Sequence, residues 1–410
     1  MSKLIKIILI FVVVAGVVGA GVYFGTRQEP GAPTDGSGGG EQTSLPGVQP
    51  GELGEGNLPT QGADGEVGVG AQIGNKIGEV IEVIGAKILY KQPVLDFSRT
   101  SDGGVVLINK KGVIVSVSAS GEEKELNNSE IENPLSATFS NDSKKILVSY
   151  GKPGTPQFSV YDTASSTWQP ILANVAATIR PESHEVVYLY EKNGLKNLML
   201  WDLKKPKSTP QQISSLQIED PVLSWKDKDT LLISERPSAY IKGSILAFSI
   251  SKKTVAPLIK DKYALHSIWN NAGTTGLAFY GDNTYRGGSL RLYGKGGEEG
   301  SKLTLLTLPE KCSFFAPSPA TTTAPVDTYL YCAIPRNSQT FKLAIMPDDY
   351  FKGITATEDD LVKINLNDGS LNVVFSPVDN PVGIYKVSVA ENSVYFLNRN
   401  NDALYSVPNK

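Results

Sequence analysis

Cysteine and histidine are the residue types that most often act as nucleophiles, general bases and metal ligands. They occupy only four of 410 positions: Cys312, Cys332, His184 and His266. Two histidines exclude a histidine-rich metal site, and a hydrolytic triad would have to use one of them. Neither cysteine has an evident histidine partner, and the sequence has no nucleophile elbow, phosphate loop, zinc motif or paired-carboxylate signature. We therefore predict no catalytic residue, no metal ligand and no cofactor.

The two cysteines lie in neighbouring apolar segments, KCSFF and TYLYCAIP, which a Pro/Thr-rich loop joins. If both segments are strands of one hairpin, their Cα atoms can approach to the roughly 4.4–6.8 Å that a disulfide needs. An even pair of cysteines in an exported domain favours a disulfide between Cys312 and Cys332. The alternative is a pair of buried free thiols.

Carboxylates gather in Pro347–Gly353 and again in Glu358–Asp360. Hard cations prefer oxygen ligands, but the spacing matches no calcium-binding repeat, so a solvated acidic loop is the preferred interpretation. Because binding residues often sit on loops over a rigid scaffold, we also predict that this insertion contacts a partner. The candidate contact residues are Asp348, Asp349, Tyr350, Phe351 and Lys352.

Further charged side chains could face a central channel or an outer surface, and the sequence alone does not orient them. They are Asp96, Arg180, Arg236, Arg286 and Arg399. Aromatic residues such as Tyr161, Trp201 and Trp225 cluster where strands are expected to end, and we predict that most of them pack between sheets.

These residues must be positioned by strands, because apolar segments alternate with turn-forming clusters along the chain. The unit Ser136–Leu172 illustrates the pattern: a strand ends at Phe139, and three further strands follow after polar or Gly/Pro turns. We expect those three strands at Ile146–Tyr150, Phe158–Tyr161 and Trp168–Leu172. The next unit, Ala176–Ile213, repeats this order.

The end of the first strand recurs at regular intervals, which marks a repeat. The spacings between these ends are 42, 40, 46, 44, 46 and 74 residues, from Phe97, Phe139, Ile179, Trp225, Trp269, Phe315 and Val389. Four-stranded propeller blades repeat every 40–50 or so residues, and the long last interval fits one blade with insertions near Ser318–Val326 and Pro347–Asp360. We predict an all-β propeller of seven blades, with six or eight as alternatives and a pair of β-sandwiches as the competing fold.

The two ends of the expected domain complement each other. The last blade supplies only three strands, Ile384–Val389, Val394–Leu397 and Leu404–Val407, whereas Lys87–Tyr90 precedes the first blade and has no blade of its own. We predict that this N-terminal strand completes the last blade and closes the ring, which removes an exposed sheet edge.

The repeat motifs also carry a family resemblance. FSNDSKKILVSY, from Phe139 to Tyr150, resembles the F-S-P-D-G-K element of bacterial WD-repeat-like propellers of the TolB-like type. The steps Tyr161-Asp162 and Trp201-Asp202 are similar to that family's aromatic–Asp pair, although Ser-Asn-Asp-Ser replaces Ser-Pro-Asp-Gly. The resemblance covers about residues 80–408. It implies the propeller fold and says little about activity.

The N-terminal region predicts the location of the domain. Ile7–Phe24 is an unbroken apolar run preceded by Lys3 and Lys6, long enough for a transmembrane helix with its N-terminus in the cytoplasm. A cleavable signal peptide, cut near Ala20, is the alternative. We assign residues 1–27 to a signal-anchor, the Gly/Pro-rich residues 28–75 to a disordered linker, and 76–410 to an extracytoplasmic propeller, in the periplasm or at the cell surface.

Composition and patterns together favour a binding protein. The formal net charge of −3 offers no basic surface for nucleic acid. We predict a membrane-tethered scaffold that binds a protein or a cell-envelope component without catalysis. The alternative is a propeller hydrolase or lyase acting on envelope polysaccharide or peptide, because catalytic residues of all-β enzymes come from scattered loops.

Overall fold

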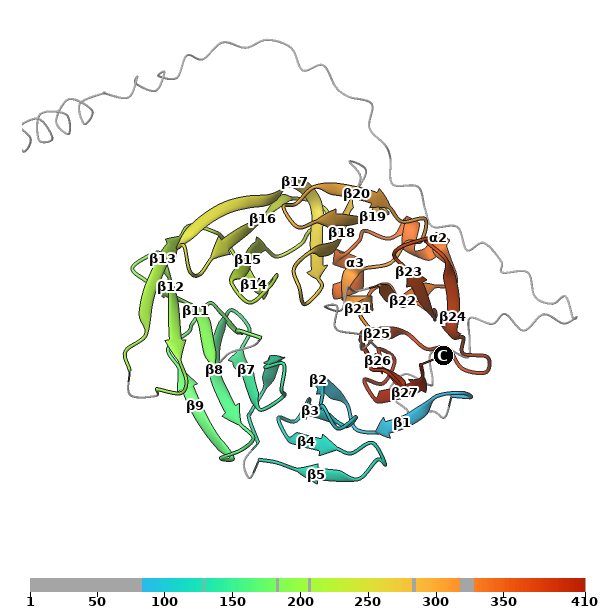
Figure 1. Ribbon diagram of the computed structural model, residues 1–410, viewed down its shortest axis with the longest axis horizontal. Helices are drawn as coiled ribbons and strands as arrows, with labels where there is room; N and C mark the ends of the chain where they lie inside the picture. Colours follow the sequence, from blue (N-terminus) through green and yellow to red (C-terminus); the bar gives the residue numbers. More distant parts are fainter. Residues whose placement is uncertain are drawn as a thin grey trace, which may run out of the picture. The chain divides into compact units, whose positions relative to one another are not determined.

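The computed structural model describes residues 83–127, 130–181, 184–205, 208–281, 285–317 and 328–409. These residues form antiparallel sheets that are arranged radially around a centre, as the predicted β-propeller requires (Figure 1). None of the helices in these ranges has the length and apolar character needed to cross a bilayer. The predicted anchor (1–27) and linker (28–75) lie outside the described residues.

Three four-stranded sheets come first along the chain, each in sequential strand order. The first contains β2 (Val94–Arg99), β3 (Val105–Asn109), β4 (Ile114–Val117) and β5 (Glu123–Glu125). The second contains β6 (Pro134–Phe139), β7 (Lys145–Lys152), β8 (Thr155–Asp162) and β9 (Thr167–Ile171). The third contains β10 (Ala176–Ile179), β11 (Glu185–Lys192), β12 (Leu195–Asp202) and β13 (Gln211–Leu216).

A seven-stranded sheet follows, and two more four-stranded sheets complete the order. The large sheet contains β14 (Pro221–Trp225), β15 (Thr230–Glu235), β16 (Lys242–Ser249), β17 (Thr254–Trp269), β18 (Thr275–Gly281), β19 (Ser289–Gly294) and β20 (Glu299–Lys302). The next contains β21 (Cys312–Phe315), β22 (Tyr329–Pro335), β23 (Asp359–Asn365) and β24 (Leu371–Phe375). The last contains β25 (Ile384–Val389), β26 (Ser393–Asn398), β27 (Leu404–Pro408) and β1 (Lys87–Tyr90).

Most predicted repeat positions coincide with the end of a first strand, whereas Phe97 lies inside β2, which ends at Arg99. Phe139, Ile179, Trp225, Phe315 and Val389 are each the last residue of such a strand. The agreement has a local cause: an aromatic or β-branched residue packs against the neighbouring sheet, and the polar turn that follows ends the strand. The three strands predicted after β6 are also confirmed as β7, β8 and β9.

Hydrophobic clusters lie between consecutive sheets and form the core. The second strands of the sheets read as continuous apolar runs because both of their faces are covered. All five residues of β3, for example, are buried. Tyr161 packs with residues of the first and second sheets, and Trp201 and Trp225 pack in the next two clusters. The prediction that most strand-end aromatics pack between sheets is thus confirmed for these residues.

The turn between β6 and β7, in the motif Phe139–Tyr150, links the second sheet to the first. The hydroxyl of Ser140 donates to Asp142 Oδ1 at 2.7 Å and accepts from the backbone N–H of Lys145 at 3.0 Å. Ser143 adopts a left-handed conformation with φ of 56°, a region that favours glycine. Its hydroxyl donates to the carbonyl of Arg99 at 2.8 Å, in the first sheet. The serine that replaces the family's glycine therefore supplies a hydrogen bond that glycine cannot make.

The ring closes as the sequence predicted, through pairing of β1 with β27. Lys87 lies opposite Ser406 and Ile88 lies opposite Tyr405 in this antiparallel pair. Behind it, one hydrophobic cluster joins β1 to the first and last sheets, with Leu89 and Leu404 among its buried members. Strand pairing and side-chain packing therefore close the ring together.

We expect Leu89→Ala to lower the free energy of unfolding by about 2–5 kcal/mol, because it removes buried methyl groups and leaves a cavity at the closure. Urea unfolding of the full-length chain, followed by tryptophan fluorescence, measures the change. Val378→Ala is the matched control, since Val378 is 79% exposed, and its effect should stay within about 0.5 kcal/mol. Equal effects of the two substitutions would show that the closure contributes little to stability.

Candidate functional site

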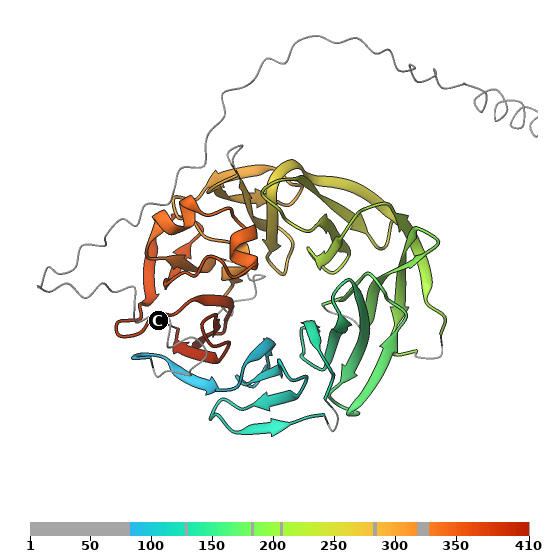
Figure 2. The same cartoon turned by 180° about the vertical axis from the view of Figure 1, so that it is seen from behind.

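The predicted contact insertion contains two short helices between β22 and β23. They are α2 (Ser338–Leu343) and α3 (Asp348–Phe351). The side chain of Asn337 caps α2 by accepting a hydrogen bond from the Gln339 N–H at 3.0 Å. Figures 1 and 2 both place α3 on the inner side of its sheet, toward the centre of the ring. The α3 part of the insertion therefore lies on the inner side of the ring of sheets.

The two carboxylates of α3 hold the insertion in place. Asp348 accepts a hydrogen bond from the Ala239 N–H at 2.7 Å and one from the Ser238 hydroxyl at 3.2 Å, both in the loop after β15. Asp349 accepts from the Ile345 N–H at 2.8 Å, within the insertion. The Asp348 bonds dock α3 onto the seven-stranded sheet and the Asp349 bond holds the turn before α3, so both carboxylates have a positioning role.

Tyr350 is the anchor of α3 and does not reach solvent. Its side chain is 1% exposed, and the guanidinium carbon of Arg399 lies 3.8 Å from the centroid of its ring. Arg399 also donates a hydrogen bond from Nη2 to the Tyr350 carbonyl. Burial raises the pKa of the Tyr350 hydroxyl, which keeps it neutral. The predicted contact residue Tyr350 is therefore a core residue, whereas Phe351 and Lys352 beside it are exposed.

A fully buried ion pair lies beneath α3. Lys311 Nζ is 2.7 Å from Asp359 Oδ1 and 2.8 Å from the Thr357 hydroxyl, and neither charged side chain is exposed. Asp359 Oδ2 also accepts the Ile384 N–H of β25 at 2.8 Å. Burial lowers the pKa of Lys311, and the charge of Asp359 opposes this effect. The expectation of a solvated acidic loop is therefore wrong for Asp359: the lysine that pairs with it lies 48 residues earlier, beyond any local pattern.

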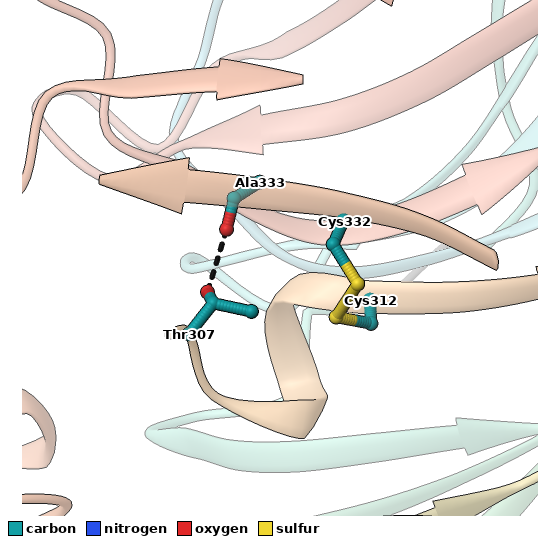
Figure 3. Close-up of a disulfide and its surroundings, with 4 residues drawn as sticks. All are labelled: Thr307, Cys312, Cys332 and Ala333. Carbon is teal, nitrogen blue, oxygen red and sulfur yellow. Dashed lines mark hydrogen bonds between the residues drawn. A yellow bond between two sulfur atoms is a disulfide. The ribbon is translucent and has the colours of Figure 1, made fainter. Parts of the chain in front are cut away.

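The predicted disulfide between Cys312 and Cys332 forms (Figure 3). Cys312 directly follows Lys311 of the ion pair in the chain. Cys312 and Cys332 are directly opposite each other in β21 and β22, with their Cα atoms 4.1 Å apart. The turn before β21, η2 (Pro309–Lys311), is held by a hydrogen bond from the Thr307 hydroxyl to the Ala333 carbonyl at 2.6 Å. The disulfide, the turn and the ion pair together fix the base of the insertion.

Above this base lies a pocket of about 750 Å³, which we call the α3 pocket. It is bounded by β14, β15, the second half of β17, η2, α3 and β25. Its apolar lining includes Val222, Leu232, Pro237, Leu265 and Phe351. Its charged lining consists of Arg236, Glu310, Asp348, Lys352, Lys386 and Arg399. Such a mixture of apolar surface and a few converging polar groups is typical of a binding site.

Two bulged strands shape the α3 pocket. The register of β17 shifts between Tyr263 and His266, and that of β25 shifts between Tyr385 and Ser388. Lys386, inside the second shift, has a φ of 52°. Bulges of this kind redirect side chains and often border functional sites. A positive φ outside glycine costs free energy, and here it brings Lys386 to the pocket wall.

His266 and Glu310 meet at the wall of the α3 pocket, with His266 Nδ1 2.8 Å from Glu310 Oε2. The ring of Phe351 lies edge-on to the imidazole, with centroids 6.0 Å apart. The sequence had singled out His266 as a possible triad member, but it gave no sign of this carboxylate partner. No group of three or more His, Cys, Asp or Glu side chains in the described part of the chain is arranged to hold a metal ion.

The other charged residues named from the sequence separate into two groups. Arg236 and Arg399 line the α3 pocket, and Asp96 pairs with Lys386 at its edge. Arg180 instead pairs with Glu185 and stacks on a tryptophan between sheets, and Arg286 is exposed before β19. Lys386 and Glu310 were missed, because only the bulge and the η2 turn bring them to the pocket.

Comparison with known proteins supports the fold. No protein-family model matches the chain, and no curated protein matches it. Among solved structures, the β-propeller domain of Cps50 (Swd1) from Myceliophteria thermophila aligns with a TM-score of 0.50 and 11% identity, covering 79% of this chain and 100% of that one.

Two further solved structures are similar at lower scores. The β-propeller domain of the Trilobed protease from Pyrococcus furiosus has a TM-score of 0.49 and 14% identity, covering 78% of this chain and 96% of that one. An oligogalacturonate lyase in complex with manganese has a TM-score of 0.48 and 10% identity, covering 78% and 97%. The likeness to the Cps50 domain, at 11% identity, supports a β-propeller fold and does not transfer an activity.

We expect Asp359→Asn to lower the free energy of unfolding by about 3–5 kcal/mol, because it leaves the Lys311 ammonium buried without a counter-charge. The double variant Lys311→Met/Asp359→Leu should lose much less, since it removes both charges. Urea unfolding of the full-length chain measures both effects.

The neighbouring Asp360 provides the control. Its ion pair with Arg336 is partly exposed, so Asp360→Asn should cost no more than about 1 kcal/mol. A loss for Asp359→Asn as small as that for Asp360→Asn would contradict the structural importance of the buried pair.

Proposed function

We propose that this protein is a membrane-tethered, extracytoplasmic propeller of seven blades that binds a protein or another cell-envelope component at the α3 pocket, without catalysis. Support for the blade count comes from β17, which pairs with β16 over Thr254–Tyr263 and with β18 over Tyr263–Trp269. It can serve as the outer strand of one blade and the inner strand of the next. Seven hydrophobic clusters among the described residues are consistent with seven blade interfaces. The TolB-like resemblance of the repeat motifs fits the same proposal.

The binding role rests chiefly on the construction of the α3 pocket. Its walls come from segments as distant as Val222 and Arg399, yet bulged strands, a buried ion pair and a disulfide hold them rigidly. Phe351, 47% exposed, and Val222, 39% exposed, present apolar surface at the pocket. A preorganised pocket with accessible apolar side chains favours binding, because little conformational entropy is lost on association.

The tether and the export follow from the sequence. The apolar run at residues 7–24 with its N-terminal lysines supports a signal-anchor, and the composition of 28–75 supports a flexible spacer. The single disulfide agrees with a domain that folds in an oxidising compartment.

For export, we expect alkaline phosphatase fused after Lys410 to be active in bacterial cells, since that enzyme folds only outside the reducing cytoplasm. Replacing Val13 and Val14 by arginine should abolish this activity, because two charges at the centre of the apolar run prevent insertion. Placing arginines at Thr34 and Ser37, in the expected linker, is the matched control and should leave activity intact. The assignment would be overturned if the alkaline phosphatase fusion were inactive while a reporter that works only in the cytoplasm was active at the same position.

For binding, we expect a photo-reactive benzoylphenylalanine at position 351 to capture a specific envelope component in living cells. The same group at position 172 is the control, because Leu172 is 72% exposed and is not part of the α3 pocket. A shift in gel mobility detects the crosslinked product, and mass spectrometry identifies the captured component. Identical products from both positions, or none from position 351, would contradict the proposed site.

The hydrolase or lyase alternative has one observation in its favour, the contact of His266 with Glu310 in the pocket wall. The capture experiment separates the two functions. If the polymer or peptide captured from position 351 is shortened when His266 is present but intact when His266→Gln is added, the protein is an enzyme. If its length is the same in both, binding is the function.

A further inference from the structure

The charges that line the α3 pocket are not balanced within it. Two of the four cations already have partners: Arg236 Nε lies 2.6 Å from Asp220 Oδ2, and Lys386 pairs with Asp96. Of the two carboxylates, Asp348 accepts a hydrogen bond from the loop after β15, whereas Glu310 Oε2 lies 2.8 Å from His266 Nδ1. The other two cations are Lys352 and Arg399, and among the described residues neither forms an ion pair with a carboxylate.

Arg399 is held ready to bind an anion. Its guanidinium stacks on the Tyr350 ring and donates one hydrogen bond to the Tyr350 carbonyl, which fixes its position. A guanidinium has five N–H donors, so most of its donors remain for a ligand. Because the group is already ordered, a carboxylate that binds to it costs little additional side-chain entropy.

Apolar side chains lie beside these cations. Phe351 precedes Lys352 directly and is half-exposed, and Val222 presents a second exposed apolar group across the pocket. Leu232 and Leu265 are buried in the lining. A ligand that fills this site therefore needs an apolar group close to its negative charge.

We infer that the α3 pocket recognises an acidic peptide segment, in which a carboxylate is adjacent to an aliphatic or aromatic side chain. The carboxylate pairs with Arg399 and Lys352, and the apolar side chain covers Phe351 and Val222. An acidic polysaccharide supplies the charge but no apolar side chain, and a nucleic acid needs many more cations than the two that are unpaired here. This inference rests on the proposed binding function and specifies the partner as a protein.

The test uses the full-length chain in nanodiscs and a phage library of random heptapeptides. We expect the selected sequences to contain Asp or Glu next to an apolar residue. A fluorescein-labelled synthetic copy of the best sequence then gives the Kd by fluorescence polarisation. Exchange of its acidic residue for Gln or Asn should weaken binding at least about tenfold, the loss typical of one charge-assisted hydrogen bond.

Variants of the protein locate the contact. Lys352→Gln and Arg399→Gln should each weaken binding of the acidic peptide several-fold or more. Neither should weaken binding of the peptide whose acidic residue has been exchanged for Gln or Asn, which we call the amide peptide. Arg399→Lys keeps the charge and should restore part of the affinity. Arg399 also supports α3, so its substitution could act through the fold. Lys352 is exposed, and the inference therefore requires that Lys352→Gln weaken binding of the acidic peptide. Lys342→Gln on α2, outside the pocket, is the matched control and should bind like the unsubstituted protein.

Selection of neutral or basic peptides, failure to select any sequence, or equal affinity for the acidic and amide peptides would overturn the inference. Failure of the proposed function is a separate result, seen as absence of capture from position 351 in cells. A captured partner that contacts Phe351 through a segment without acidic residues would refute the acidic-peptide inference and leave the binding function intact.

Discussion

Closure of the ring by pairing β1 with β27 is the constraint on which the rest of the structure depends. The last sheet has only three strands from the C-terminal part of the chain, so without Lys87–Tyr90 it would expose a pairing edge and part of a hydrophobic cluster. Closure also sets the distances between inner strands. Val222 on β14 and Arg399 after β26 line one pocket because the ring brings the C-terminal sheet close to a sheet from the middle of the chain.

Within that ring, the insertion between β22 and β23 is held partly by a buried ion pair, whose formation requires two charges to be removed from water. A buried ion pair such as Lys311–Asp359 is seldom a net source of stability, because removing both charges from water costs nearly as much as their attraction returns. Its effect here is positional. Asp359 joins the start of β23 to β25, Lys311 ends the η2 turn, and the adjacent disulfide joins β21 to β22. A register or packing error at this place would strand a buried charge, so the pair selects one arrangement of α3.

The α3 pocket is where these constraints converge. Bulges in β17 and β25, the docking of Asp348 on the loop after β15 and the stacking of Arg399 on Tyr350 all act on the same small volume. A propeller supplies rigid inner strands and variable connections, which suits it to binding as well as to catalysis. In this chain Arg236 and Lys386 pair with carboxylates outside the pocket lining, whereas Lys352 and Arg399 form no ion pair within the described residues, which points to recognition of an anion.

Most of the elements that could be predicted from the residues alone have local causes. Strand ends at positions such as Phe139 and Trp225 and the Cys312–Cys332 disulfide follow from apolar alternation, turn residues and adjacency within one hairpin. The closing strand at Lys87–Tyr90 pairs with a distant segment, and the repeat made it predictable because the last blade lacked one strand. Tertiary structure alone decided that Asp359 is buried, that Tyr350 is a core residue, and that His266, Glu310 and Lys386 share a pocket with Arg399. These outcomes depend on contacts between segments tens to hundreds of residues apart, and the identity of a residue carries no information about which distant partner will cover its charge.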